Sequence, residues 1–420
     1  MKKTKSILAL AIALFTCLTC FASVAFAADH AEGTPGNPAQ AAITKHLQLP
    51  KGTKIPTVDF EFEVEKVTVD GIAGSMPTIG NNGKVTISFS DKMTPTYTED
   101  VLDITHIYME SANLLATVTG SNAWPHAGEY VYKITETEKT YAAIDEDHEI
   151  MEYSQAEYTM TVWVKETALN SGVYYAASIF AVRNVLDDGT EAPKNDKVNP
   201  EPKADGKYSG MVFTNAYVHT NGTDDIDNPD PTDPAEATLT ISKAVDGTYA
   251  STSVAFTFKV TVNEPAFVNE PKPDLPGTYT AYIVGPGSTI AGTVEFPDGT
   301  EKSFTLKHGQ KLVFVNTPVG TTYDVKETGT AAYKAEANIT SNGVSEGAVT
   351  GALGADAEFL HRFVGEAANT AAFTNIREEV TPTGLNINDL PFIGMIVLAL
   401  AAVAVVAVVK ARKRKLCTQN

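Results

Sequence analysis

Hydrophobic and polar residues alternate through two long stretches of this 420-residue chain. In the first stretch, residues 58–65 place Val and Phe between acidic residues, and residues 158–164 alternate in the same way. In the second stretch, residues 254–262 alternate Val and Phe with polar side chains. A period of two is typical of half-buried β-strands, and long amphipathic helical repeats are absent. The pattern therefore predicts an all-β chain of two β-sandwiches in tandem.

Both ends of the chain depart from this pattern. Residues 390–409 carry no charge over about 30 Å of helix, which is enough to cross a bilayer, and residues 410–415 are strongly basic. At the other end, three lysines precede an apolar run over residues 7–21 and a small-residue site ending at Ala27. We interpret residues 1–27 as a cleaved signal peptide and residues 390–409 as a transmembrane helix, so that the chain between them is exported.

Composition divides the exported part into segments. Residues 28–40 are small and polar and are expected to form a disordered lead-in, followed by the first sandwich over residues 41–220. Residues 221–236 are acidic and rich in proline, which favours an extended linker, and residues 237–377 form the second sandwich. Residues 378–420 form the C-terminal sorting region. Residues 70–128 are interpreted either as a ligand-binding insertion or as a long connection within the first sandwich.

The net charge and the positions of the cysteines argue against two properties, nucleic-acid binding and stabilisation by disulfide bonds. Without the three N-terminal lysines, the five Lys and Arg residues of the tail and Asp389, the chain keeps 24 basic and 50 acidic residues. Such a negative surface argues against nucleic-acid binding. The three cysteines lie at positions 17, 20 and 417, outside the exported part. The exported domains therefore need a covalent tie other than a disulfide, or none.

An internal repeat supplies candidates for such a tie. Each half contains a lysine two residues after an isoleucine, a glutamate that ends a strand begun by tyrosine, and an asparagine that ends a Phe-Thr-Asn segment. Because side chains two residues apart share one face of a strand, all three polar groups would face the core. These residues are Lys45, Glu136 and Asn215 in the first half and Lys243, Glu327 and Asn375 in the second half.

Burial would shift the pKa values of the lysine and the glutamate and make the lysine reactive. It lowers the pKa of a lysine and raises the pKa of a glutamate. A neutral lysine amine is a nucleophile, and a protonated glutamate can polarise the asparagine carboxamide and shuttle protons. Attack on that carboxamide expels ammonia and leaves a Lys–Asn isopeptide bond. The ordinary alternative is that the lysine and glutamate extend to water while the asparagine lies in a turn. Glu138 shares a face with Glu136 and is an alternative to it.

The repeat and the two ends of the exported part together resemble a known family. The Thr-Lys-His-Leu start at residue 44 and the Thr-Pro-Thr-Gly end at residue 381 resemble Gram-positive, sortase-assembled backbone pilins of the streptococcal isopeptide-linkage type. The second half resembles the smaller CnaB-type domains. The resemblance implies Ig-like or CnaB-like sandwiches, with Glu136 and Glu327 promoting the bonds Lys45–Asn215 and Lys243–Asn375. It implies single-turnover autocatalysis and no enzyme activity, cofactor or metal.

The resemblance also implies a sortase site just before the apolar helix. The motif is Val380, Thr381, Pro382, Thr383 and Gly384. A sortase thiolate would attack the carbonyl of Thr383 and form an acyl-enzyme, which an amine resolves. Residues 390–394, Leu-Pro-Phe-Ile-Gly, compete with this motif but have isoleucine at the position of the acyl-forming threonine. We expect cleavage between Thr383 and Gly384.

Polymer growth requires an acceptor lysine on the neighbouring subunit. Residues 191–210 precede the last strand of the first domain, where the related pilin places its linking lysine. Lys207 has the closest matching offset from Asn215 and Lys203 the next, while Lys194 and Lys197 lie in the same segment. The ordinary interpretation of each is a solvated loop lysine.

These observations predict a structural subunit of a covalently polymerised pilus that is anchored in the cell wall. The expected partners are a sortase, other copies of the chain, minor pilins, peptidoglycan and host surface ligands. The main alternative is a monomeric, wall-anchored surface adhesin. An enzyme is disfavoured because the exported part has no cysteine nucleophile and no GxSxG motif, and residues 148–152 lack the second histidine of a zinc-protease helix.

Overall fold

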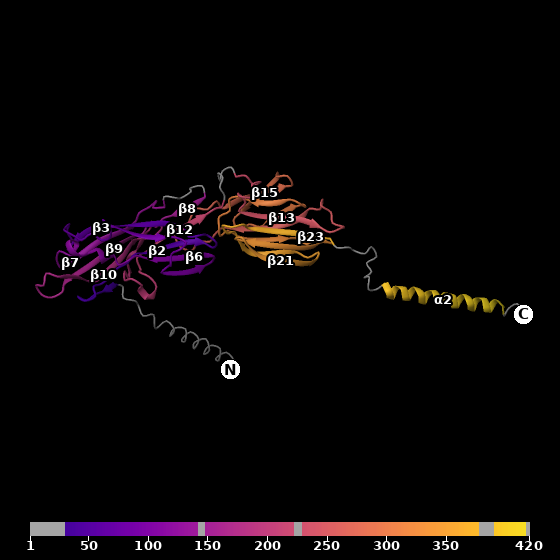
Figure 1. Cartoon of the computed structure of the whole chain (residues 1–420), viewed down its shortest axis with the longest axis horizontal. Helices are drawn as coiled ribbons and strands as arrows, with labels where there is room; N and C mark the ends of the chain where they lie inside the picture. Colours follow the sequence, from indigo (N-terminus) through magenta and orange to yellow (C-terminus); the bar gives the residue numbers. More distant parts are fainter. Residues whose placement is uncertain (1–29, 142–147, 222–228, 378–389, 417–420) are drawn as a thin grey trace, which may run out of the picture.

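The structure is a computed structural model that describes residues 30–141, 148–221, 229–377 and 390–416. Two β-domains lie end to end along one axis (Figure 1). The predicted signal peptide at residues 1–27 and the predicted sorting motif at residues 380–384 lie outside the described residues.

The first domain consists of two facing sheets. One sheet has the strand order β1-β10-β9-β7-β3-β4, with β11 also paired to β10, and the other has the order β5-β6-β2-β12-β8. The strands of the first sheet are β1 (His30–Glu32), β3 (Val58–Val69), β4 (Lys84–Phe89), β7 (Gly128–Glu136), β9 (Glu157–Glu166), β10 (Tyr174–Val185) and β11 (Glu191–Val198). Those of the second sheet are β2 (Thr44–Pro50), β5 (Tyr97–Val101), β6 (Ile104–Glu110), β8 (Glu149–Glu152) and β12 (Val212–His219).

The second domain repeats this arrangement. Its larger sheet has the order β16-β15-β18-β13-β23-β20-β21, and its smaller sheet has the order β17-β14-β19-β22. The strands of the larger sheet are β13 (Leu239–Asp246), β15 (Thr278–Gly285), β16 (Thr289–Pro297), β18 (Lys311–Phe314), β20 (Lys334–Ser341), β21 (Val344–Leu353) and β23 (Thr370–Ile376). Those of the smaller sheet are β14 (Phe256–Asn263), β17 (Lys302–Leu306), β19 (Thr322–Glu327) and β22 (Ala357–Phe363).

The alternating segments form the strands at the centre of each core. In β3, Phe60 and Phe62 are fully buried while the acidic residues between and after them face outward. In β14, Phe256 and Phe258 are buried in the same way. Each domain has its own continuous cluster of buried hydrophobic side chains. The predicted all-β fold with tandem sandwiches is confirmed.

Two expectations about the connecting segments are wrong for the residues that can be described. The lead-in was expected to be disordered, but His30–Glu32 forms β1 and pairs with β10, and the ring of His30 stacks on Phe180 at 4.8 Å. The edge of β10 supplies backbone partners that composition alone does not reveal. In the acidic linker, residues 231–236 form turns in place of an extended spacer, and Glu236 is buried.

Residues 70–128 belong to the sandwich itself. They contribute β4 to one sheet and the pair β5 and β6 to the other, together with the short 3-10 helices η1 (Leu114–Thr117) and η2 (Gly120–Asn122). A third such helix, η3 (Ala204–Gly206), lies between β11 and β12. The interpretation as a long connection within the first sandwich holds, and nothing in these residues requires a separate ligand-binding insertion.

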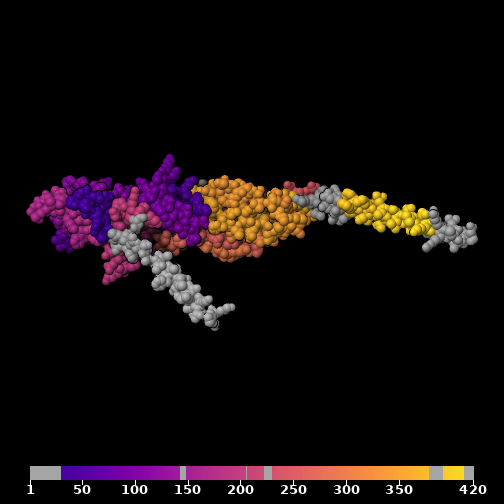
Figure 2. Space-filling view, turned by 90° about the horizontal axis from the view of Figure 1, so that it is seen from below, coloured from indigo at the N-terminus to yellow at the C-terminus, as the bar shows by residue number. Residues whose placement is uncertain are grey.

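The two domains contact each other directly. Phe267, from the β14–β15 connection, packs against Ile104 and Val218 of the first domain. The Gln48 side-chain amide donates to the carbonyl of Asn269 at 3.2 Å. The space-filling view shows the two domains as one continuous body (Figure 2).

One helix among the described residues is long and apolar enough to cross a membrane. It lies within α2 (Leu390–Leu416), where residues 391–410 have a mean hydropathy of 3.1. This helix fits the predicted C-terminal membrane span.

Candidate functional site

Apart from the short edge strand β1, the first strand of each domain pairs in parallel with the last strand, and this pairing places the predicted residues together. In the first domain, β2 pairs with β12 so that Lys45 lies opposite Phe213, and Asn215 follows two residues later. In a strand, residues two apart share a face, so Lys45 and Asn215 project from the same side of the sheet. Glu136 ends β7 in the opposite sheet and faces them.

The second domain has the same register. There, β13 pairs with β23 so that Lys243 lies opposite Phe373, two residues before Asn375. Glu327 ends β19 in the opposite sheet. Each domain thus brings together one residue from its first strand, one from its last strand and one from across the sandwich.

In the first centre, one carboxylate links the two other side chains. Lys45 Nζ donates to Glu136 Oε2 at 2.7 Å, and Asn215 Nδ2 donates to Glu136 Oε1 at 2.9 Å. The side chains of the lysine and the glutamate are fully buried. The phenyl ring of Phe60 lies 4.6 Å from the amine. The glutamate therefore touches the amine through one oxygen and the carboxamide nitrogen through the other.

The second centre repeats these contacts. Lys243 Nζ lies 2.9 Å from Glu327 Oε2 and 3.2 Å from Glu327 Oε1. Asn375 Nδ2 also donates to Glu327 Oε1. The ring of Phe256 lies 4.4 Å from the amine. All three polar residues are almost completely buried.

The alternatives that the sequence left open are resolved by burial. Neither lysine nor glutamate extends to water, because their side chains are at most 2 % exposed. Glu138 is exposed, whereas Glu136 is buried and accepts a hydrogen bond from Lys45, so Glu136 is the glutamate at the site.

Burial sets the proton affinities of both pairs. It lowers the pKa of Lys45 and of Lys243 to about 8, against the opposing effect of the neighbouring glutamates. It raises the pKa of Glu136 and of Glu327, again against the attraction of the lysines. The two shifts favour transfer of a proton from the ammonium to the carboxylate, which leaves a nucleophilic amine beside a protonated acid.

The contacts narrow the role that the glutamate can take. It was expected to polarise the asparagine carboxamide and to shuttle protons, and in both centres it contacts the carboxamide nitrogen. In the expected isopeptide chemistry that nitrogen is the leaving group, so the geometry suits proton delivery to departing ammonia. Polarisation of the carbonyl must come from another group.

Sequence reasoning missed two residues of the first centre. The backbone N–H of Ser154 donates to Asn215 Oδ1 at 2.7 Å. Asp187 Oδ1 accepts a hydrogen bond from Ser154 Oγ at 2.5 Å. A backbone donor leaves no signature in the sequence, and Asp187 lies in a turn without any alternating pattern.

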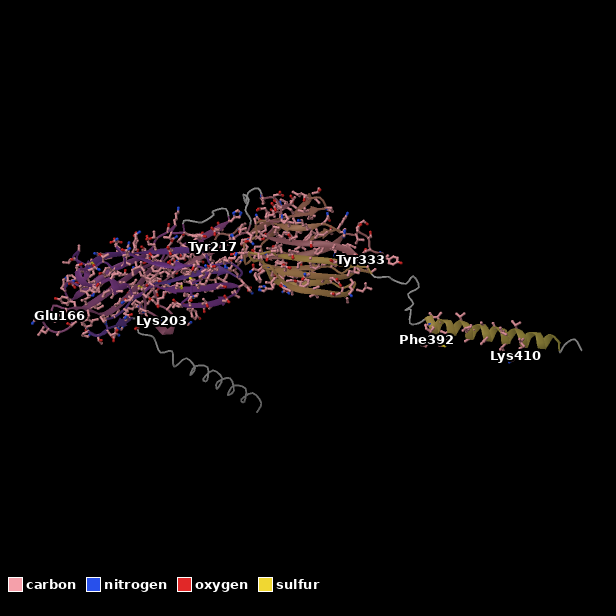
Figure 3. The ribbon with its side chains drawn as sticks, in the orientation of Figure 1. Glu166, Lys203, Tyr217, Tyr333, Phe392 and Lys410 are labelled. Carbon is pink, nitrogen blue, oxygen red and sulfur yellow. The ribbon has the colours of Figure 1, made fainter. Side chains whose placement is uncertain are left out.

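The predicted acceptor lysines lie between β11 and β12. Lys203 and Lys207 are exposed, and Lys207 Nζ lies 4.8 Å from the ring of Tyr97. Lys194 and Lys197 lie on β11. Figure 3 shows Lys203 on the first domain, farther from the second domain than Tyr217. The competing motif at residues 390–394 is part of α2.

Comparison with known proteins finds a matching family model for each of the two domains. Residues 41–218 match the Spy0128-like isopeptide containing domain. Residues 237–377 match a domain of unknown function.

Two curated relatives come from Streptococcus pyogenes. A pilin of serotype M1 is 25% identical over 397 residues, which is 91% of this chain and 94% of the relative. The pilus tip adhesin Cpa is 29% identical over 183 residues, which is 43% of this chain. The chain spans 23% of the length of that adhesin. The resemblance to backbone pilins predicted from the sequence is confirmed.

Solved structures of major pilins from the same organism are also similar. One, an N168A mutant, is 20% identical, with 80% of this chain and 99% of that chain covered and a TM-score of 0.32. Another, the T3.2 major pilin, is 18% identical, with 84% of this chain and 100% of that chain covered and a TM-score of 0.29.

A bell-shaped pH dependence is expected for closure of the first centre. Below the raised pKa of Glu136 the lysine stays protonated and cannot attack, so the rate falls in acid. Above about pH 8, the pKa of Lys45, the pair loses the proton that the leaving nitrogen needs, so the rate falls again.

The measurement starts from unfolded, unlinked ectodomain that is diluted into buffers of different pH. Loss of ammonia is then followed by intact mass, with Lys243→Met present so that only the first centre can react. A rate that rises steadily through pH 8 to 10 would show that the amine alone limits closure.

Proposed function

We propose that this chain is the shaft subunit of a covalent surface pilus and that each subunit is reinforced by two Lys–Asn isopeptide bonds. The observation that carries the proposal is the repeated placement of a buried lysine and asparagine on parallel first and last strands beneath a glutamate. Similarity to a pilin over 94% of that relative's length supports the shaft role. The tip adhesin is matched over 23% of its length, so the adhesin alternative is not favoured.

The topology suits a protein under tension. In a fibre joined through Thr383, a pulling force would enter the second domain through β13 and leave it through β23, and these strands are neighbours. A bond between Lys243 and Asn375 would carry this force directly from one strand to the other. The remaining strands of that sandwich would then bear little load. In the first domain the force would enter at Lys207 or Lys203, next to β12, and a bond between Lys45 and Asn215 would tie β2 to this loaded strand.

The reaction proposed for each centre uses only the chain's own groups. The amine of the lysine attacks Cγ of the asparagine, the glutamate passes a proton to the carboxamide nitrogen, and ammonia leaves. The glutamate regains a proton from the attacking nitrogen and ends unchanged. Because the product stays in the protein, each centre acts once, and the domain is structural and has no turnover.

Assembly is proposed to run through the sorting region. A sortase would cleave between Thr383 and Gly384 and transfer the threonine to a lysine of the next subunit, while α2 holds the precursor in the membrane. The helical conformation of residues 390–394 supports the upstream motif, because α2 begins at the first residue of the competitor. Other copies of the chain, minor pilins and peptidoglycan are the proposed partners.

The first expected outcome concerns mass. The ectodomain should be lighter than its sequence by two ammonia molecules, and Glu136→Ala and Glu327→Ala should each restore one because the proton shuttle is lost. Glu138→Ala is the matched control and should leave both losses intact. A wild-type ectodomain of unmodified mass would refute the bonds.

A second outcome concerns stability. The bond from Lys45 to Asn215 closes a loop of more than a hundred residues, worth about 5 kcal/mol by the chain-entropy relation used for disulfides. Lys45→Met removes the bond but keeps an apolar side chain of similar length in the site. We expect the first domain to melt roughly 10–20 °C lower, by the usual relation between stability and melting temperature. Calorimetry with Lys243→Met as the counterpart assigns the transition, and unchanged melting would contradict the role of the bond.

A third outcome concerns the joint between subunits. Tandem mass spectrometry of proteolysed fibres should find a branched peptide that ends in Thr383 and is attached to Lys207 or, second in rank, Lys203. Wall extracts boiled in detergent should show a ladder that Thr383→Ala abolishes. A branch on a lysine outside residues 191–210 would contradict the assignment, and a single band in the wild type would indicate a monomeric adhesin.

A further inference from the structure

The first centre contains a hydrogen-bond donor aimed at the atom where negative charge would develop. Ser154 lies in the connection between β8 and β9, and its backbone N–H donates to Asn215 Oδ1 at 2.7 Å. Ser154 is 2% exposed and Asn215 is fully buried. Because β8 pairs with β12, the chain that leaves β8 passes beside the end of the asparagine side chain.

The donor is held in place by a second, partly buried network of hydrogen bonds. Asp187, in the turn between β10 and β11, accepts hydrogen bonds through Oδ1 from Ser154 Oγ at 2.5 Å and from the Thr214 N–H at 2.7 Å. The backbone carbonyl of Asp187 also accepts from the N–H of Gln155 at 3.0 Å. One aspartate therefore ties the β8–β9 connection to the strand that carries Asn215.

These contacts fix the orientation of the asparagine amide. An N–H can only donate, so it selects the oxygen of the carboxamide and leaves Nδ2 directed at Glu136. The attacked carbonyl then faces a donor while the leaving nitrogen faces the proton shuttle.

We infer that the Ser154 backbone N–H is the oxyanion donor of the first centre and that Asp187 is its positioning residue. The inference rests on the proposed isopeptide chemistry. During attack, the Nζ–Cγ bond forms and the carbonyl π electrons move to Oδ1, where the N–H stabilises the negative charge. The attacking nitrogen then gives a proton to one oxygen of Glu136, whose other oxygen gives a proton to Nδ2. The Cγ–Nδ2 bond breaks, ammonia takes the bonding pair, and the carbonyl re-forms.

The second centre lacks this feature among the described residues. Asn375 Oδ1 is buried and has no hydrogen-bond partner there, although Lys243 and Glu327 make the same contacts as their counterparts. A buried carbonyl without a donor is uncommon in folded proteins. The two centres therefore share the nucleophile and the shuttle, but within the part of the chain that the structure describes only the first has a donor on the developing oxyanion.

The direct test replaces the backbone N–H group of residue 154 by an oxygen atom. The full chain is made by cell-free translation in detergent micelles, with the hydroxy-acid counterpart of serine at position 154, so that an ester replaces the amide and the N–H is absent. Lys243→Met restricts the reaction to the first centre. Loss of ammonia is followed by intact mass in acid-quenched samples. Loss of a single oxyanion donor slows acyl transfer about 10²–10³-fold, and a slowing of this order is expected here.

The same replacement at Ser209 is the matched control. Its N–H donates to Glu110 Oε1 at 2.7 Å in the same domain, and Ser209 is also fully buried, but this bond does not touch the reacting atoms. The Ser209 ester should close its bond at nearly the wild-type rate. Equal rates for the two esters, whether both fast or both slow, would overturn the inference.

Asp187 is tested by rescue. Asp187→Asn keeps an oxygen that can accept from Ser154 Oγ and from Thr214 N–H, so its rate should stay within a few-fold of the wild type. Asp187→Ala removes the acceptor and should slow closure by at least tenfold, with resistance to trypsin used to check folding. Equal rates in these two variants would contradict the positioning role.

The outcomes separate this inference from the proposed function. If wild-type chain loses no ammonia, the isopeptide chemistry itself fails. If wild-type chain loses ammonia from both centres and the Ser154 ester reacts as fast as the wild type, only the oxyanion assignment fails.

Discussion

The parallel pairing of the first and last strands is the constraint on which each domain depends. Antiparallel neighbours are usually joined by short turns, whereas a parallel pair needs a long connection, and here the rest of the domain is that connection. The pairing brings together two side chains that are 170 residues apart in the first domain and more than a hundred apart in the second. The opposite sheet then supplies the glutamate. The strand topology of the sandwich thus places together the three side chains that the proposed cross-link needs.

The sequence was sufficient to predict the parts of this arrangement that depend on strand periodicity. Lys45, Glu136 and Asn215 each lie two residues from a hydrophobic side chain, and the period of two assigns them to the core face without any tertiary information. The repeat in the second half made the assignment stronger, since a chance pattern would not recur in the same order. Glu138 shared the predicted face but lies beyond the end of β7, where the strand geometry no longer applies.

What the sequence could not predict depends on loops and on backbone atoms. Ser154 acts through an N–H that every residue except proline has, so its identity carries no signal. The pairing of His30–Glu32 with β10 depends on a free sheet edge and arises only when distant segments meet. The turns at residues 231–236 are closed locally, because side-chain oxygens of Asp230 and Asp233 accept from N–H groups two residues further on. Prediction from local pattern therefore ends at the strand boundaries.

The free energy of burying the lysine and the glutamate links the folding of each domain to the proposed formation of the bond. Removing the lysine and glutamate from water costs several kcal/mol per charge, and their mutual attraction offsets this cost only in part. An unreacted folded domain therefore holds a buried pair that destabilises it. The proposed reaction would convert the amine and the carboxamide into a neutral amide and release ammonia, so the buried charge would no longer have to be stabilised. The burial that weakens the newly folded domain also lowers the pKa of Lys45, and in the proposed chemistry it would favour conversion of this side chain into a covalent tie.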